Sequence, residues 1–144
     1  MTEDCLAALK ARSDDEGFRR LLGIEVVELQ PGRCRTAMVF DPRHNNVFAM
    51  LHGGALFSLM DEAFQLACNG VGETSVAMQI SINFIAPAEP GARILAEAKQ
   101  VHTTGKTDLY ECAAWQEADG KQLARCSALA YRTRRPHPWL APGE

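Results

Sequence analysis

A carboxylate within an apolar helix, together with two glycines at the start of that helix, is the feature of this sequence best suited to chemistry. From Ala55 onward, apolar residues recur at the three- and four-residue spacing of an α-helix. The polar residues among them, Ser58, Asp61 and Gln65, fall on one narrow stripe. A helix that is apolar around most of its circumference is expected to be wrapped by other structure. Asp61 is therefore expected in or near an apolar wall, where a carboxylate is costly unless it is used.

The start of this helix is predicted at His52, Gly53 and Gly54. No Ser, Thr, Asp or Asn stands there to cap the first turn, so backbone N–H groups are expected to be uncovered. Such groups, at the positive end of the helix dipole, can receive an anion or a polarised carbonyl oxygen. A tight turn alone would also explain two adjacent glycines.

The spacing of Gly53 and Asp61 makes it difficult for both to act on one substrate atom within one chain. They are separated by eight positions, about 12 Å along a helix axis. One substrate carbon cannot easily contact both groups. If they cooperate, Asp61 should come from a second subunit.

The composition is that of one ordinary globular domain. The chain has 144 residues, of which 47% are hydrophobic and 23% are charged. The net charge of −3 gives no electrostatic argument for a nucleic-acid partner. The longest apolar segment, 47–60, is interrupted by His52 and the glycines, so we expect no membrane span. The first residues lack a basic region followed by an apolar run, so we expect no signal peptide and a cytoplasmic protein.

The cysteines and histidines do not form a recognisable metal or disulfide pattern. The five cysteines are odd in number and lack a C-x-x-C motif, so we expect reduced core residues. Cys68 has no nearby histidine in the sequence that would activate it as a nucleophile. The four histidines lack zinc-ligand spacing, so neither a metal nor another cofactor is expected.

The segments around the helix are predicted to form an antiparallel sheet, because turn signals separate them and no helix intervenes between the last strands. The predicted strands are 24–30, 33–41, 75–85, 93–103, 107–116 and 121–133. The sequence thus predicts an α+β fold in which a curved antiparallel sheet of five or six strands wraps a long central helix. The expected units are an N-terminal helical segment (1–22), the main domain (23–133) and an irregular Pro-rich tail (134–144), from which Trp139 docks on the body.

The spacing of Asn46, His52-Gly53-Gly54 and Asp61, with the later segment INFIAPA, resembles the hotdog-fold acyl-CoA thioesterases of the phenylacetyl-CoA thioesterase type. The resemblance covers residues 40–131. In such proteins the monomers pair so that their sheets join, and two dimers often form a tetramer. The resemblance therefore implies a homodimer, and a homotetramer built as a dimer of dimers. Each active site would take Gly53 from one subunit and Asp61 from the other.

The resemblance also implies a role for each of these residues. The Gly53 amide would polarise the thioester carbonyl, and Asp61 would be the general base for water or the direct nucleophile. Asn46 would hold the water or the carbonyl group. His52 would orient the helix-start loop or hydrogen-bond near the thioester, or it would be structural only. Desolvation is expected to raise the pKa of Asp61 above its usual value of about 3.9.

The acyl pocket is expected to be apolar and to lie near the helix start, where Gly54 also belongs. Its predicted lining is Phe57, Met60, Phe64 and residues near Met50. The same side chains would form a core in a protein without a ligand, so phenylacetyl, other aromatic and medium-chain acyl groups all remain open.

Two further residues are candidates for substrate contacts. Some relatives place a Ser or Thr on the strand after the helix, facing the site. The corresponding residue here is Ala77, and Ser81 is predicted two pleats further along the same face. Lys106, in the turn with Thr104 and Gly105, could meet a CoA phosphate, although basic residues in turns are usually only solvated.

Hydrolysis of an acyl-CoA thioester to a carboxylic acid and free CoA, as in phenylacetate degradation, is the predicted activity. Two alternatives remain. Hotdog hydratases or dehydratases usually carry a histidine in an H-F-P-like loop, which LHGGALF does not match. A non-catalytic acyl-CoA binding protein would have no use for Asp61, whose burial is costly.

Overall fold

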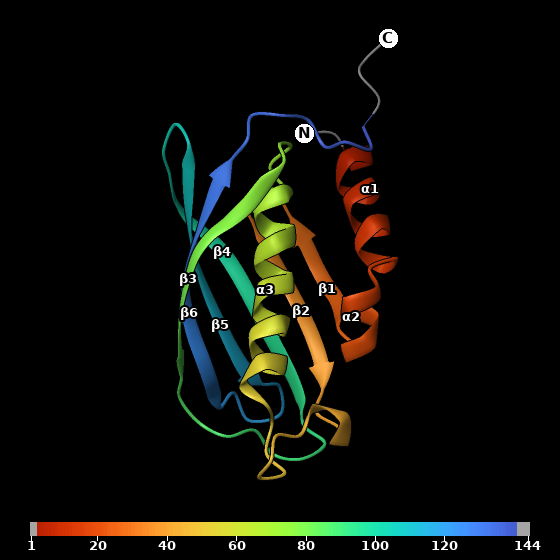
Figure 1. Ribbon diagram of the computed structural model, residues 1–144, viewed down its shortest axis with the longest axis vertical. Helices are drawn as coiled ribbons and strands as arrows, with labels where there is room; N and C mark the ends of the chain where they lie inside the picture. Colours follow the sequence, from red (N-terminus) through yellow and green to blue (C-terminus); the bar gives the residue numbers. More distant parts are fainter. Residues whose placement is uncertain (1–2, 141–144) are drawn as a thin grey trace.

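A long helix lies against one face of a single antiparallel sheet (Figure 1). The structure, a computed structural model, describes residues 3–140. Its elements are α1 (Glu3–Asp14), α2 (Gly17–Leu22), β1 (Glu25–Gln30), β2 (Arg33–Val39), the 3-10 turn η1 (Pro42–His44), α3 (Gly53–Asn69), β3 (Ser75–Phe84), β4 (Arg93–Thr103), β5 (Thr107–Gln116) and β6 (Gln122–Arg132). The six strands are ordered β1-β2-β4-β5-β6-β3, and all neighbours are antiparallel. The predicted α+β hotdog architecture is confirmed. Within residues 3–140, no helix is both long and apolar enough to span a membrane.

Helix α3 is held by its apolar face. Leu59, Met60 and Phe64 are almost completely buried between the helix and the sheet. The Phe64 ring meets the Tyr110 ring of β5 edge to face, with 5.4 Å between the ring centres. Thr36 of β2 donates a hydrogen bond to the Leu59 carbonyl (2.9 Å), which ties the middle of the helix to the sheet. Helices α1 and α2 lie beside α3 over the β1 end of the sheet (Figure 1).

Strand β3 forms one edge of the sheet, and the part of the chain that the structure describes pairs it only with β6. Large apolar side chains on it remain exposed, among them Val76, Met78 and Phe84. A β-bulge interrupts its pairing with β6, because Ala77 lies opposite Ala130 while Gln79 already lies opposite Leu129. Met78 is the extra residue, and it reverses the alternation of side chains along the rest of β3.

The segment after β6 is irregular but firmly attached. The Thr74 N–H donates to the Arg135 carbonyl (2.9 Å), and the buried His137 ring contacts the Asn69 carbonyl through Nε2 (3.0 Å). Trp139 stacks on His137 at 4.7 Å between ring centres and packs against the core. The predicted docking of Trp139 is confirmed. Residues 141–144 of the predicted tail lie outside the described residues.

Candidate active site

The first turn of α3 is capped by a side chain and leaves one backbone amide without a partner among the described residues. His52 Nδ1 accepts a hydrogen bond from the Gly54 N–H (2.8 Å), so the helix is capped by an imidazole and the expectation of an uncapped start is wrong. A neutral imidazole nitrogen can accept in the same way as the usual capping oxygens. Among residues 3–140, the Gly53 N–H has no hydrogen-bond partner. The cap therefore leaves Gly53 as the donor available to a ligand.

The packing at Gly53 leaves little room for a side chain. A Cβ atom added there would lie 3.1 Å from Cζ of Phe84, at the end of β3. Gly53 and Phe84 share the lining of a cavity of about 310 Å³ with Met50 and Leu56. The free amide thus lies at the Phe84 end of the edge strand.

Asn46 organises the loop that leads into α3. Its Oδ1 accepts hydrogen bonds from the N–H groups of Phe48 (2.9 Å) and Met50 (3.1 Å), and its own N–H donates to the Met50 carbonyl (2.8 Å). Ala49 completes this tight loop with a positive φ of 57°. The side-chain oxygen of Asn46 is therefore engaged in the loop, which leaves its amide nitrogen as the group that could contact a ligand.

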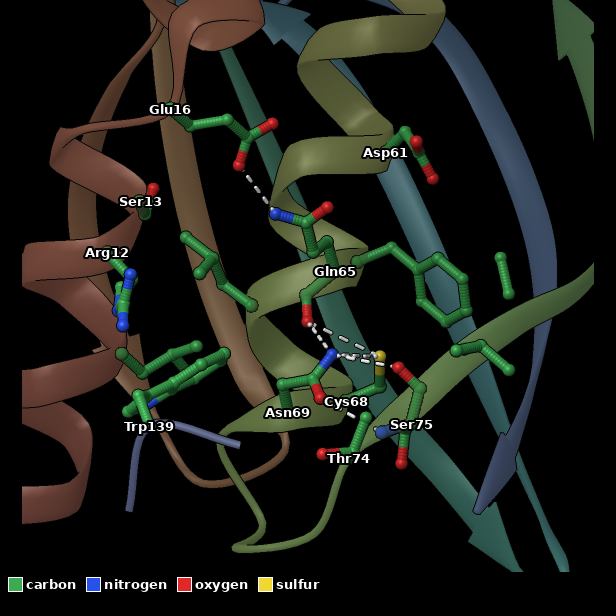
Figure 2. Close-up of a pocket in the computed structure, with 15 residues that line it drawn as sticks. Arg12, Ser13, Glu16, Asp61, Gln65, Cys68, Asn69, Thr74, Ser75 and Trp139 are labelled. Atoms are coloured by element: carbon green, nitrogen blue, oxygen red, sulfur yellow. Dashed lines mark hydrogen bonds between the residues drawn. The ribbon is translucent and has the colours of Figure 1, made fainter. Parts of the chain in front are cut away.

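Asp61 lies two turns further along α3, half-buried at a second cavity of about 490 Å³ (Figure 2). Its carboxylate has no hydrogen-bond partner within the described residues. Burial raises the pKa of Asp61 above its ordinary value, and the nearby negative charge of Glu16 raises it further. The predicted direction of the pKa shift is confirmed. An unpartnered carboxylate beside an apolar cavity is a group that can take a proton or attack an electrophile.

Two more carboxylates near Asp61 were not expected from the sequence. Glu62 is more buried than Asp61, at 6% exposure, and accepts a short hydrogen bond from Ser13 of α1 (2.6 Å). Glu16 lines the same cavity as Asp61 and accepts a hydrogen bond from Gln65 (2.9 Å). The position of Glu62 on the buried face of the predicted helix was the available signal, but its partner on α1 is not visible in the sequence.

The side chains expected to line one acyl pocket lie at different places. Phe64 lines the Asp61 cavity, whereas Met60 is a core residue with 1% exposure. Phe57, His52 and Gly54 line a third cavity of about 480 Å³, between α2, the η1 turn and the start of α3. Within one chain, the structure does not bring Phe57 and Phe64 together.

Ala77 and Ser81 do not share a face, because the bulge at Met78 lies between them. Ala77 lines the Asp61 cavity. Ser81 pairs with Ser127 and lines a shallow pocket on the other face of the sheet. The predicted common face is wrong for this reason. Ser75, two residues before Ala77 and ahead of the bulge, is the hydroxyl residue that lines the Asp61 cavity.

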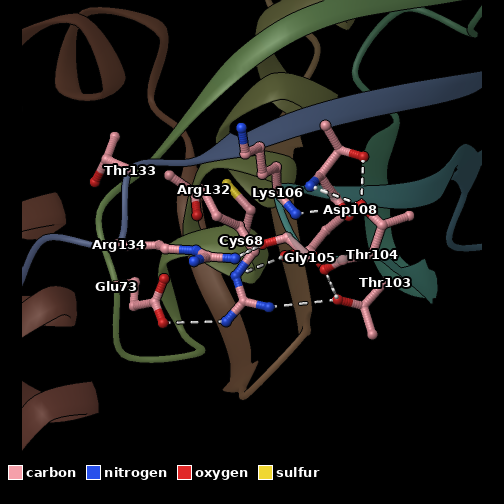
Figure 3. Close-up of polar contacts among 12 residues, drawn as sticks. Cys68, Glu73, Thr103, Thr104, Gly105, Lys106, Asp108, Arg132, Thr133 and Arg134 are labelled. Atoms are coloured by element: carbon pink, nitrogen blue, oxygen red, sulfur yellow. Dashed lines mark hydrogen bonds and ion pairs between the residues drawn. The ribbon is translucent and has the colours of Figure 1, made fainter.

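Lys106 is exposed in the turn between β4 and β5 (Figure 3). This turn is fastened to the end of β6, since Arg134 donates to the Gly105 carbonyl (2.6 Å) and the Arg132 N–H donates to the Lys106 carbonyl (2.8 Å). Arg132 forms an ion pair with Glu73 (3.2 Å). The turn therefore carries basic groups at a fixed place on the surface.

The cysteines of this region are not suited to nucleophilic chemistry. All five cysteines of the chain are buried free thiols, as predicted. Burial raises the pKa of Cys68 to about 12, so its thiol stays protonated at neutral pH. In the part of the chain that the structure describes, no group of three or more His, Cys, Asp or Glu side chains could hold a metal ion.

Comparison with known proteins connects this arrangement to a family. Residues 48–122 match the family described as thioesterase superfamily. A putative esterase of Archaeoglobus fulgidus is 34% identical over 118 residues, which cover 82% of this chain and 76% of that protein. The acyl-coenzyme A thioesterase PaaI of Escherichia coli is 32% identical over 101 residues, covering 70% and 72%. The solved structure of the E. coli PaaI protein from the phenylacetic acid degradation operon superposes with a TM-score of 0.83 at 27% identity, covering 91% of this chain and 96% of that one. This chain belongs to the thioesterase superfamily.

Proposed function

We propose that this protein hydrolyses acyl-CoA thioesters to a carboxylic acid and free CoA. The observation that carries the proposal is the half-buried, unpartnered carboxylate of Asp61, whose pKa is raised, on the same helix as the free amide of Gly53. The similarity to the acyl-coenzyme A thioesterase PaaI supports the same activity.

The site is completed by a second copy of the chain. Gly53 and Asp61 line different cavities. The two residues are about 12 Å apart along the axis of α3. The Gly53 cavity adjoins the Phe84 end of β3, and the Asp61 cavity adjoins the Ala77 end. If two β3 edges pair antiparallel about a two-fold axis, the Phe84 end of one strand meets the Ala77 end of the other. Gly53 of one subunit then approaches Asp61 of the partner subunit.

The exposed edge of β3 favours this pairing. An edge strand with unpaired backbone groups and exposed apolar residues such as Val76, Met78 and Phe84 is suited to extending the sheet across two subunits. We propose a homodimer of this kind, and a homotetramer formed from two such dimers.

In the composite site, the Gly53 N–H donates a hydrogen bond to the thioester carbonyl oxygen and stabilises the negative charge that develops there. Asp61 either removes a proton from the attacking water or attacks the carbonyl carbon itself. If water attacks, the C–S bond breaks, the carboxylic acid is released, and the CoA thiolate takes up the proton that Asp61 removed. If Asp61 attacks, the C–S bond breaks to leave a mixed anhydride between the acyl group and Asp61. A water molecule then hydrolyses this anhydride to the carboxylic acid and the free Asp61 carboxylate, and the CoA thiolate takes up the proton released. His52 keeps the donor in place by capping the next amide, and the Asn46 side-chain nitrogen is available to the water or the carbonyl group.

CoA itself is expected to lie outside the apolar cavities, because its phosphates need charged or polar surroundings. The exposed Lys106, beside Arg134, offers a phosphate a positive surface at the β4–β5 turn. The acyl group occupies the cavity beside Asp61. Phenylacetyl and medium-chain acyl groups are the first candidates to test.

The decisive experiment is release of free thiol from a panel of aromatic and straight-chain acyl-CoAs by wild type and by Asp61→Asn. We expect hydrolysis by wild type and loss of turnover in the variant, with acyl-CoA binding retained. Wild-type hydrolysis by Asp61→Asn would refute the assigned role. Binding without hydrolysis by the wild-type protein would instead identify a non-catalytic acyl-CoA binder, and hydration of an enoyl-CoA would identify a hydratase.

A further inference from the structure

The Asp61 cavity is an elongated groove along α3, and Trp139 stands at its far end (Figure 2). The α3 residues that line it run from Asp61 to Asn69, about 12 Å along the helix. Helix α1 forms one wall and the start of β3 the other. Figure 2 shows Asp61 at the upper end of this groove and Trp139 at the opposite, lower end beside Arg12.

Trp139 is held as a fixed wall. Its indole ring stacks on His137 with an angle of 5° between the rings. On the α1 side, the guanidinium of Arg12 lies 5.4 Å from the centre of the indole. His137 is itself buried and joined through Nε2 to the Asn69 carbonyl. These contacts join the C-terminal segment to both α1 and α3, so the indole cannot move without breaking them.

We propose that Trp139 closes the end of the acyl-binding groove and sets the longest acyl group that the enzyme accepts. This inference rests on the proposed function, because it takes the thioester carbon to lie at Asp61 and the acyl chain to extend along α3. A short acyl chain ends before the indole, and a long one meets it. Removal of the indole lets the chain continue toward the space between α1 and the C-terminal segment.

The consequence is a change in chain-length preference. Each methylene that becomes buried improves kcat/KM about fourfold until the chain reaches the end of the groove. In Trp139→Ala this improvement continues for longer chains. We therefore expect the ratio of kcat/KM for the longest to the shortest saturated acyl-CoA to rise at least tenfold, which corresponds to about two additional buried methylenes.

The chain offers a matched control. Trp115 on β5 also lies under an arginine, with Arg35 at 5.6 Å from its ring centre, but it does not line the Asp61 cavity. Trp115→Ala also removes an indole and its contact with an arginine, but away from the Asp61 cavity. The chain-length profile of this variant should therefore equal that of wild type. If Trp139→Ala also kept the wild-type profile, the inference would be overturned.

A binding measurement separates this inference from the proposed catalysis. The chain has two tryptophans, so Trp115→Phe leaves Trp139 as the single indole fluorophore. In an Asp61→Asn, Trp115→Phe protein, a saturated acyl-CoA long enough to reach the indole should change its emission, whereas free CoA should not. Binding detected by calorimetry without a change in emission would overturn the inference. The double variant could change its emission while the wild-type protein hydrolyses no acyl-CoA. That result would support the groove and refute the proposed catalysis.

Discussion

Replacement of Gly53 by Ala should slow hydrolysis without unfolding the protein. The new Cβ would lie 3.1 Å and 3.3 Å from two atoms of the Phe84 ring, closer than ordinary contact. Either the ring or the first turn of α3 must therefore shift by a few tenths of an ångström. Because the Gly53 N–H is the proposed donor to the thioester oxygen, a shift of the turn moves that donor away from its position, whereas a shift of the ring alone would leave it in place.

The size of the effect follows from the role of the donor. Complete loss of one such donor lowers kcat by about 10²- to 10³-fold. A displaced donor keeps part of its effect, so we expect kcat to fall by about 10- to 100-fold with a smaller change in KM. The crowding at Phe84 should lower the free energy of unfolding by about 1 kcal/mol, the lower end of what an added methyl costs in a packed site.

The assay is thiol release under saturating acyl-CoA, with thermal unfolding measured in parallel. Gly17→Ala is the matched control, since a Cβ atom at Gly17 meets nothing within 4 Å. It should keep the wild-type kcat. A wild-type kcat in Gly53→Ala would contradict the expected displacement of this amide by the added methyl group.

Four other predictions concern three side chains of the site. His52→Ala removes the acceptor for the Gly54 N–H and should lower the free energy of unfolding by about 1 kcal/mol, as loss of a helix cap does, which chemical denaturation would measure. The raised pKa of Asp61 means that its ionised form is disfavoured in the folded protein, so Asp61→Asn should raise the melting temperature at neutral pH. This difference should begin to shrink as the pH falls below the raised pKa and should vanish below the ordinary pKa of an aspartate. The same pKa predicts that kcat/KM falls on the acid side at a pH above the ordinary value of an aspartate, and an acid limb at or below that ordinary value would contradict it. Lys106→Ala should raise KM for acyl-CoA several-fold at low salt and leave KM for an S-acyl pantetheine unchanged, because the latter lacks the nucleotide phosphates.

The architecture could be predicted from the sequence because its signals are local and strong. The helical spacing around Leu59 and Phe64 and the turn residues between the later strands leave few alternatives. The half-buried state of Asp61 followed from its place within that apolar helix. Each of these inferences needs only the periodicity of a single segment.

The errors arose where one residue changed the local geometry. The bulge at Met78 carries no glycine or proline to mark it, yet it sends Ser81 to the other face of the sheet. His52 is not among the usual capping residues, so its bond to Gly54 was not expected. The docking of Trp139 was predicted, but its place in the Asp61 cavity was not. That place depends on contacts with Arg12 and His137, which are distant from each other in the chain and become neighbours only on folding.

The most direct test of the account is complementation between two impaired subunits. Gly53→Ala and Asp61→Asn chains, carrying different tags and expressed together, would be purified as the mixed dimer. If each site takes Gly53 from one chain and Asp61 from the other, one of the two sites in a mixed dimer is free of both substitutions, so the dimer should recover about half of the wild-type activity. A mixed dimer no more active than the average of its two parent variants would show that both residues act within one chain, and it would contradict the composite site.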